Sequence, residues 1–197
     1  MTRRGNSTMV GLSAPRVLVI PRWGGTPADE WYPWLTRELP GTSAVELPNP
    51  EAPSLEAWVQ GVLAAIGNDP YALARTLLIG HSAGCRAVLH ALAQLPPGRA
   101  VNKVLCIAGW WTLDQPWPEI QPWIDAPLDL EAVSEGHTGM RVLLSSNDPF
   151  TANYEANAAQ WRSSLDADVV VIPEAKHFNG ELQPIVLDQA RTLYTAL

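Results

Sequence analysis

The sequence has few cysteines and no long apolar run. Only two of its 197 residues are cysteines, Cys85 and Cys106, and they form no C-x-x-C pair. Two cysteines are too few for a disulfide framework, so we expect both to be small buried side chains in a cytoplasmic protein. No stretch approaches the roughly 18 apolar residues that a membrane span requires, so we expect no membrane association.

Positive charge is also scarce. The chain carries 13 Lys and Arg against 20 Asp and Glu, a net charge of −7. Without a basic stripe to neutralise phosphates, nucleic acid and anionic membranes are disfavoured as partners. Metal-ligand spacings such as H-E-x-x-H, a Walker A motif and the Rossmann glycine fingerprint are all missing from the sequence. We therefore expect no metal and no cofactor.

The composition is that of a globular domain of ordinary size. Hydrophobic residues make up 47% of the chain and charged residues 17%, which argues against disorder. Residues 1–15 include Arg3 and Arg4 but no apolar core of signal-peptide length. We expect a flexible N-terminal extension over 1–15 and a single domain over 16–197.

Short β-prone apolar runs alternate with helical patterns along the chain. The expected strands are 17–20, 43–47, 76–79, 103–108, 140–145 and 168–172. The expected helices are 29–39, 54–66, 83–95, 152–165 and 184–196. This alternation predicts an α/β fold, a three-layer αβα sandwich around a mostly parallel sheet of about six strands. The chain leaves little room for a large lid domain.

A glycine–x–serine–x–glycine motif occupies residues 80–84 between an expected strand and an expected helix. A serine at such a sharp turn is the nucleophile elbow of hydrolases, and flanking glycines relieve crowding there. The helix N-terminus also directs free N–H groups toward negative charge that develops beside Ser82. The alternative is a glycine-rich turn in which Ser82 only caps the helix.

An acid and a base follow two later strands. Asp148 comes after the run 140–145, and His177 comes after the run 168–172. Functional groups gather at the carboxyl ends of parallel strands, and Ser82, Asp148 and His177 follow the α/β-hydrolase chain order. His177 would take the serine proton, and Asp148 would hold the imidazole tautomer.

Backbone N–H groups are the expected partners of an oxyanion. Ala83 is the first candidate, and the second is Trp23 or Gly24 in the loop after the first strand. His81 is expected to be a packed or hydrogen-bonded support rather than a second base. His90 and His137 have no partners in the sequence, and we expect them at the surface.

The chain has nine tryptophans, an unusual number. Trp110, Trp111 and Trp117 follow the fourth expected strand and leave the sheet at the edge where Ser82 lies. They either form an aromatic wall over an apolar substrate group or pack the helices onto the sheet. Trp31 and Trp34 are expected in the core.

Taken together, the motifs resemble the small serine hydrolases of the retinoblastoma-binding-protein-9 type, which have the α/β-hydrolase fold. The resemblance covers nearly the whole chain after residue 15. Its motifs are W-Y-P-W-L at 31–35, L-P-N-P at 47–50 with Pro53 and Trp58, G-H-S-A-G-C at 80–85, S-N-D-P-F at 146–150 and K-H-F-N at 176–179.

The resemblance implies the triad Ser82, Asp148 and His177, and it raises the prospect of a protein partner. Family members carry glycine where this chain has Arg22, which leaves the second oxyanion donor open. Arg22 either faces solvent or recruits an acidic substrate.

The function expected from the sequence is a metal-free serine hydrolase. It would form a covalent acyl-enzyme with a small ester, thioester or amide, a small-molecule acyl substrate. The alternative is a binding or adaptor module that keeps the triad with little turnover. The acyl length and the oligomeric state are not defined by the sequence.

Overall fold

The structure, a computed structural model, describes residues 15–195, so the expected N-terminal extension lies outside the described residues apart from Pro15. The strands are β1 (Arg16–Ile20), β2 (Thr42–Ala44), β3 (Thr76–His81), β4 (Lys103–Ile107), β5 (Met140–Ser145) and β6 (Asp168–Ile172). The helices are α1 (Tyr32–Glu38), α2 (Leu55–Ile66), α3 (Pro70–Leu73), α4 (Ala83–Leu92), α5 (Gln121–Asp125), α6 (Leu130–Glu135), α7 (Tyr154–Leu165) and α8 (Pro184–Tyr194).

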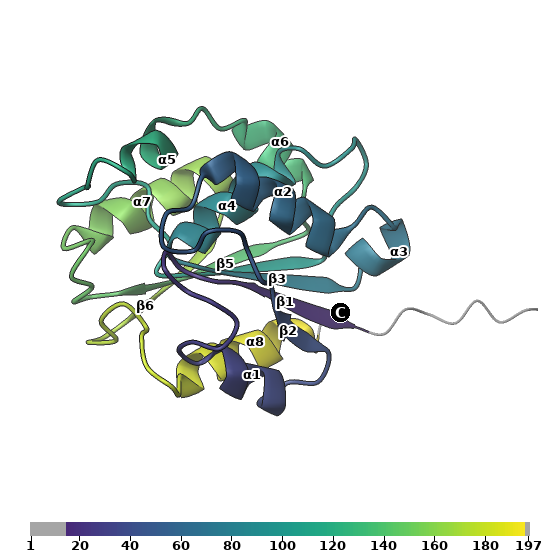
Figure 1. Cartoon of the computed structure of the whole chain (residues 1–197), viewed down its shortest axis with the longest axis horizontal. Helices are drawn as coiled ribbons and strands as arrows, with labels where there is room; N and C mark the ends of the chain where they lie inside the picture. The colour runs from purple at the N-terminus through teal and green to yellow at the C-terminus, as the bar shows by residue number, and fades with distance from the viewer. Residues whose placement is uncertain (1–14, 196–197) are drawn as a thin grey trace, which may run out of the picture.

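The six strands form one sheet in the order β2-β1-β3-β4-β5-β6, and every neighbouring pair is parallel. Helices α1 and α8 cover one face, while α2, α4, α5, α6 and α7 lie over the other (Figure 1). The predicted three-layer α/β sandwich of about six strands is therefore confirmed, and all described strand pairs are parallel.

Each central strand contributes side chains to two apolar cores, because successive side chains point to opposite faces of a sheet. In β3, Leu77 and Ile79 pack in the core beneath α1 and α8. Leu78 between them packs in the larger core beneath α2, α4 and α7. Burial on both faces explains why these strands are continuous apolar runs. Cys85 and Cys106 are buried and unpaired, as expected.

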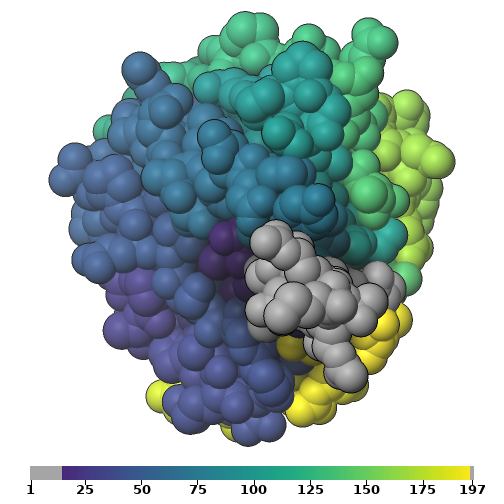
Figure 2. Space-filling view, turned by 90° about the vertical axis from the view of Figure 1, so that its right-hand side faces the viewer, coloured from purple at the N-terminus to yellow at the C-terminus, as the bar shows by residue number. Residues whose placement is uncertain are grey.

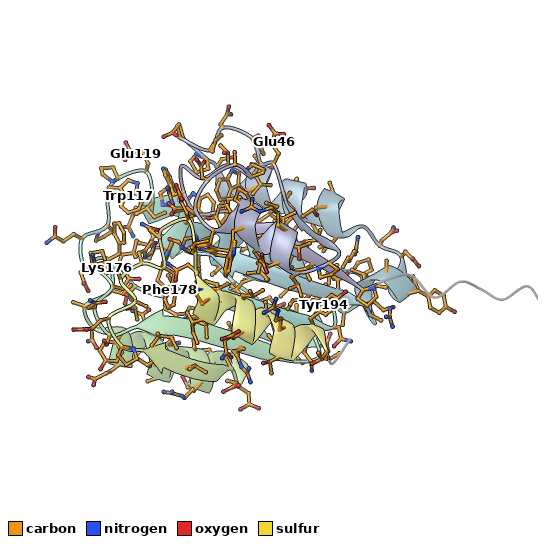
Figure 3. All side chains as sticks on the ribbon, turned by 90° about the horizontal axis from the view of Figure 1, so that it is seen from below. Glu46, Trp117, Glu119, Lys176, Phe178 and Tyr194 are labelled. Carbon is orange, nitrogen blue, oxygen red and sulfur yellow. The ribbon has the colours of Figure 1, made fainter. Side chains whose placement is uncertain are left out.

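The strands run in one direction, so their carboxyl ends share one end of the molecule. Figure 2 looks at the opposite end, where strands begin, and shows blue segments of the first half of the chain beside green and yellow segments of the second. In Figure 3, Trp117 and Lys176, from the segments after β4 and β6, lie at the carboxyl end, while Tyr194 lies toward the other end.

Within residues 15–195, no helix has the length and apolarity to cross a bilayer. The same residues contain no cluster of three or more His, Cys, Asp or Glu side chains able to hold a metal ion.

Candidate active site

Ser82 lies at the turn between β3 and α4 in a strained backbone conformation. Its φ is +53° and its ψ is −117°, a region that a residue with a Cβ rarely occupies and that clusters at functional sites. The Ser82 N–H donates to the carbonyl oxygen of Ile107 on β4 at 2.8 Å. The neighbouring strand thus stabilises the turn, and the serine side chain is held at the carboxyl edge of the sheet.

Both glycines of the motif are required by close backbone contacts. A Cβ at Gly80 would lie 2.8 Å from the Cα of Cys85. A Cβ at Gly84 would lie 2.5 Å from the carbonyl oxygen of Pro21 and even closer to that of Ile20. Since these neighbours are backbone atoms, they cannot move aside as a flexible side chain does. The glycines therefore let α4 approach both its own strand and the end of β1.

His177 and Asp148 form a buried pair on the loops after β6 and β5. The Nδ1 of His177 lies 2.7 Å from Oδ2 of Asp148, and the two side chains are 6% and 2% exposed. The other carboxylate oxygen of Asp148 accepts the Phe150 N–H at 2.9 Å. A carboxylate that accepts the Nδ1 proton leaves Nε2 as the basic nitrogen of the imidazole.

Other hydrogen bonds join the two loops. Oδ1 of Asn147 accepts the Lys176 N–H at 2.8 Å, and Oγ of Ser146 accepts the Glu174 N–H at 3.1 Å. The residues before Asp148 therefore hold the backbone that leads to His177. These contacts position the His–Asp pair from both sides.

Ser82 and His177 line one cavity of about 180 Å³. Its other lining residues are Arg22, Trp23, Trp110, Leu113, Trp117, Phe150 and Asn179. The ring of Phe150 also packs edge-on against the imidazole of His177, with centroids 4.7 Å apart. The structure thus brings the predicted serine and histidine to one mainly apolar hollow, with Asp148 behind the histidine.

The loop after β1 presents one unengaged backbone donor at this cavity. The Gly24 N–H donates to the carbonyl oxygen of Pro50 at 2.8 Å, and the Arg22 N–H donates to the hydroxyl of Tyr32 at 3.1 Å. Among the hydrogen bonds of residues 15–195, none uses the N–H of Trp23 or of Ala83. Of the two residues considered for the second donor, only Trp23 keeps its N–H available.

The tryptophans after β4 divide between the cavity and the core. Trp110 and Trp117 line the cavity, whereas Trp111 is not among the lining residues. The Trp111 ring packs on Trp161, with centroids 5.1 Å apart, and lies 5.5 Å from the guanidinium carbon of Arg86. Trp111 therefore packs in the core, whereas the aromatic wall over a substrate stays a prediction for Trp110 and Trp117. Trp31, expected in the core, is fully buried.

Arg22 is a partly exposed, ion-paired residue of the cavity wall. Its Nε and Nη2 donate to Oε1 of Glu30 at 2.9 and 2.6 Å, and its side chain is 28% exposed. The Glu30 carboxylate balances the charge of Arg22. This pairing argues against the recruitment of an acidic substrate by Arg22.

Of the three histidines outside the proposed triad, two are more buried than the sequence suggested. His81 is fully buried and hydrogen-bonded on both ring nitrogens, as expected of a support. The surface expectation was wrong for His90, which is 8% exposed, and His137 is half-buried. Burial lowers the pKa of all three, to about 3 for His81 and about 4 for His90.

The sequence interpretation missed Tyr32, Glu30 and Phe150 at this site. Phe150 directly follows Asp148 and Pro149, so its position beside the predicted acid was a local signal that it belongs to the site. The contacts of Tyr32 with His81 and of Glu30 with Gly180 left no local signal, because these partners lie 49 and 150 residues away along the chain. Such contacts become visible only once the loops after β1, β3 and β6 are brought together.

A parallel sheet that presents a strained serine beside a buried His–Asp pair defines the α/β-hydrolase class. Comparison with known families agrees, since the family described as serine hydrolase matches residues 17–190. The chain belongs to this family and is a serine hydrolase with an esterase-like fold.

Individual relatives share this architecture. YdeN of Bacillus subtilis (strain 168) is 24% identical over 170 residues, which cover 83% of this chain and 85% of YdeN. Its crystal structure matches with a TM-score of 0.78 over 92% of this chain and 100% of that one. The ferulic acid complex of Est1E from Butyrivibrio proteoclasticus is 13% identical and matches with a TM-score of 0.68 over 93% and 89%.

Proposed function

We propose that the protein hydrolyses small esters, thioesters or amides through a Ser82–His177–Asp148 triad. The observation that carries the proposal is the 2.7 Å His177–Asp148 contact beside the cavity that Ser82 lines. A histidine held by a buried carboxylate, next to a serine at a strained turn, has the arrangement that nucleophilic catalysis requires.

In the first half of the reaction, Oγ of Ser82 attacks the substrate carbonyl carbon while Nε2 of His177 takes the hydroxyl proton. The tetrahedral intermediate collapses, His177 gives the proton to the leaving group, and an acyl-enzyme remains. Water then attacks the acyl carbon, His177 takes one of its protons, and that proton returns to Ser82 as the acid leaves. Asp148 keeps the imidazole oriented and stabilises its charged form.

The N–H groups of Trp23 and Ala83 are the proposed oxyanion donors. Both belong to the turns that flank Ser82 in space, and neither is engaged elsewhere among the described residues. Gly24 is not proposed, because its N–H already donates to Pro50. Two preorganised backbone donors aimed at the developing charge commonly supply a large part of the acceleration in acyl transfer.

The cavity supports a short, apolar acyl group. Its walls are chiefly Trp23, Trp110, Leu113, Trp117 and Phe150, and its volume is about 180 Å³. Within the serine hydrolase family, we place the chain beside the retinoblastoma-binding-protein-9 type on the motifs that carry that resemblance.

The test combines a fluorophosphonate probe with a panel of p-nitrophenyl esters. We expect labelling of the wild-type protein and of Ser164→Ala, a control on α7, but not of Ser82→Ala. Hydrolysis should fall by about 10⁴-fold or more in Ser82→Ala because triad members act as a unit. Acetyl and butyryl esters should be cleaved faster than octanoyl esters, because a cavity of about 180 Å³ favours short acyl groups.

Equal labelling of Ser82→Ala and the wild-type protein would refute the assignment of the nucleophile. Labelling at Ser82 without turnover of any ester would instead favour the binding or adaptor role that the sequence left open. The predicted protein partner and cytoplasmic location stay predictions.

A further inference from the structure

Two loops that carry proposed catalytic groups are not joined by neighbouring strands. The proposed oxyanion donor Trp23 follows β1, and His177 follows β6, with β3, β4 and β5 between these strands in the sheet. Catalysis needs the oxyanion donor and the base to be held at a fixed separation, because a displacement of about 1 Å can reduce rates by about 10²-fold. Hydrogen bonds of side chains hold the two loops at this separation.

One chain of hydrogen bonds spans the two loops. The Arg22 N–H donates to the hydroxyl oxygen of Tyr32 at 3.1 Å. The Tyr32 hydroxyl lies 2.7 Å from Nδ1 of His81, and Nε2 of His81 lies 2.9 Å from the carbonyl oxygen of His177. Arg22 immediately precedes Trp23, so the chain begins beside the donor and ends on the backbone of the base.

The chemistry of the partners sets the direction of each bond. A carbonyl oxygen only accepts, so Nε2 of His81 carries the proton and donates to His177. In the neutral ring Nδ1 is then an acceptor, and the Tyr32 hydroxyl donates to it. The Tyr32 oxygen in turn accepts the Arg22 N–H. Every donor has an acceptor, and His81 has no nitrogen left with which to act as a second base.

Burial keeps this arrangement in one protonation state. Both His81 and Tyr32 are fully inaccessible to solvent. Burial, followed by the nearby His177, lowers the pKa of His81 to about 3, and burial raises the pKa of Tyr32. The imidazole is therefore neutral and the phenol protonated at neutral pH. The chain of bonds therefore does not switch at neutral pH.

A second bridge joins the same loops through Glu30. One carboxylate oxygen of Glu30 accepts from the Arg22 guanidinium at 2.6 Å, and the other accepts the Gly180 N–H at 2.6 Å. The indole N–H of Trp31 also donates to the carbonyl oxygen of Phe178 at 2.9 Å. The segment 22–32 is thus bonded repeatedly to the segment 177–180.

We propose that Tyr32 and His81 are positioning residues that hold the His177 backbone in register with the oxyanion loop at Trp23. The inference rests on the proposed function and adds to it a role for the residue that precedes the nucleophile. We call the bonded series Arg22–Tyr32–His81–His177 the relay. It moves no proton during turnover.

Tyr32→Phe is the direct test because it keeps the ring and removes only the hydroxyl. With the relay broken, we expect kcat for p-nitrophenyl acetate to fall by about 10-fold to 100-fold, while KM changes little. The matched control is Thr76→Val, at the start of the same strand that ends at His81. In the wild-type protein the buried Thr76 hydroxyl also has two partners. It accepts from Nε of Arg16 and donates to the carbonyl oxygen of Ala72, each at 2.7 Å.

Thr76→Val should lower thermal stability as Tyr32→Phe does, yet leave kcat unchanged, because Thr76 lies at the far end of the strand. A second pair tests His81 itself. His81→Leu abolishes the donor to His177, whereas His81→Gln keeps an N–H donor, so the glutamine variant should recover part of the lost kcat. Circular dichroism establishes that each variant is folded before its kinetics are compared.

The outcomes separate the relay from the proposed function. If the wild-type protein is labelled and hydrolyses the ester, but Tyr32→Phe has the kcat of Thr76→Val, the relay is overturned and the triad stands. Equal kcat values for His81→Leu and His81→Gln count against the relay in the same way. A wild-type protein that is neither labelled nor active overturns the triad and the relay with it.

Discussion

Acid should destabilise this protein through its buried histidines, and His90 offers the cleanest measurement. His90 lies on α4 and is 8% exposed, and its Nε2 has no hydrogen-bond partner among the described residues. Burial, followed by the charge of Arg86, lowers its pKa from 6.5 to about 4. The unfolded chain therefore binds a proton between these values that the folded protein does not. The free energy of unfolding must fall as the pH falls through this range.

The size of the effect follows from the two pKa values. A pH of 5 lies about 1.5 units below the pKa of the unfolded histidine, and each unit corresponds to about 1.36 kcal/mol of free energy. His90 alone should thus remove about 2 kcal/mol of stability between pH 8 and pH 5. The loss is complete only below about pH 4, where the folded histidine also becomes charged. His81 acts in the same direction.

Urea unfolding of the wild-type protein and His90→Leu at pH 8 and pH 5 isolates this contribution. Leucine fills the buried site without titrating, and no hydrogen bond of Nε2 is lost. The variant should therefore lose about 2 kcal/mol less than the wild-type protein between the two pH values. Gln94→Leu, an exposed change just after α4, should lose as much as the wild type. An equal loss in His90→Leu would refute the lowered pKa.

Two further predictions concern the geometry of the active site. Gly84→Ala should lower stability by about 1–3 kcal/mol and impair ester hydrolysis, because its Cβ would meet the carbonyl oxygens of Ile20 and Pro21; unchanged melting and kcat would contradict that contact. Leu113→Phe should narrow the cavity and shift kcat/KM from butyryl toward acetyl esters by about 10-fold, whereas Leu113→Ala should favour longer acyl groups. Identical chain-length profiles for the two Leu113 variants would remove Leu113 from the acyl pocket.

The sheet could be predicted from the sequence because its central strands are buried on both faces. Such strands appear as nearly continuous apolar runs, and β5 begins and ends where the sequence indicated. The edge strand β6 also has the predicted bounds, because its three consecutive valines are β-prone. The edge strand β2 lacks that signal and is only three residues long, Thr42–Ala44. Helices α3, α5 and α6 were not predicted, since four to six residues are too few to show a helical period.

The wrong surface assignment of His90 has a physical origin. Amphipathic helices reveal their exposed side by polar residues, so a lone histidine on a helix suggests a solvent-facing position. Helix α4 has no such side, because every residue from Ala83 to Leu92 is buried. Helix α4, which directly follows Ser82, lies between the sheet and α2 and α6 (Figure 1). Its polar residues are therefore enclosed, and their pKa values shift.

The positions of Ser82, Asp148 and His177 were predictable for a different reason from the relay. A parallel sheet places the carboxyl ends of its strands at one edge, so residue type and chain order were sufficient to group them. The contacts of Tyr32 with Arg22 and His81 depend on the packing of a loop against a helix start, which leaves no periodic pattern. Topology can be inferred from local patterns, whereas the hydrogen bonds that set distances within the site cannot.

The reaction and its substrate thus depend on different parts of the fold. The elbow rests on backbone contacts, since Ser82 and Gly84 meet the ends of neighbouring strands and Gly80 meets the start of α4. Three residues of the proposed acyl pocket, Trp110, Leu113 and Trp117, instead lie in a segment without helix or strand between β4 and α5. Loops tolerate substitution far better than packed strands do. We therefore expect changes in that segment to alter the acyl group accepted, while the proposed nucleophile, base and relay stay in place.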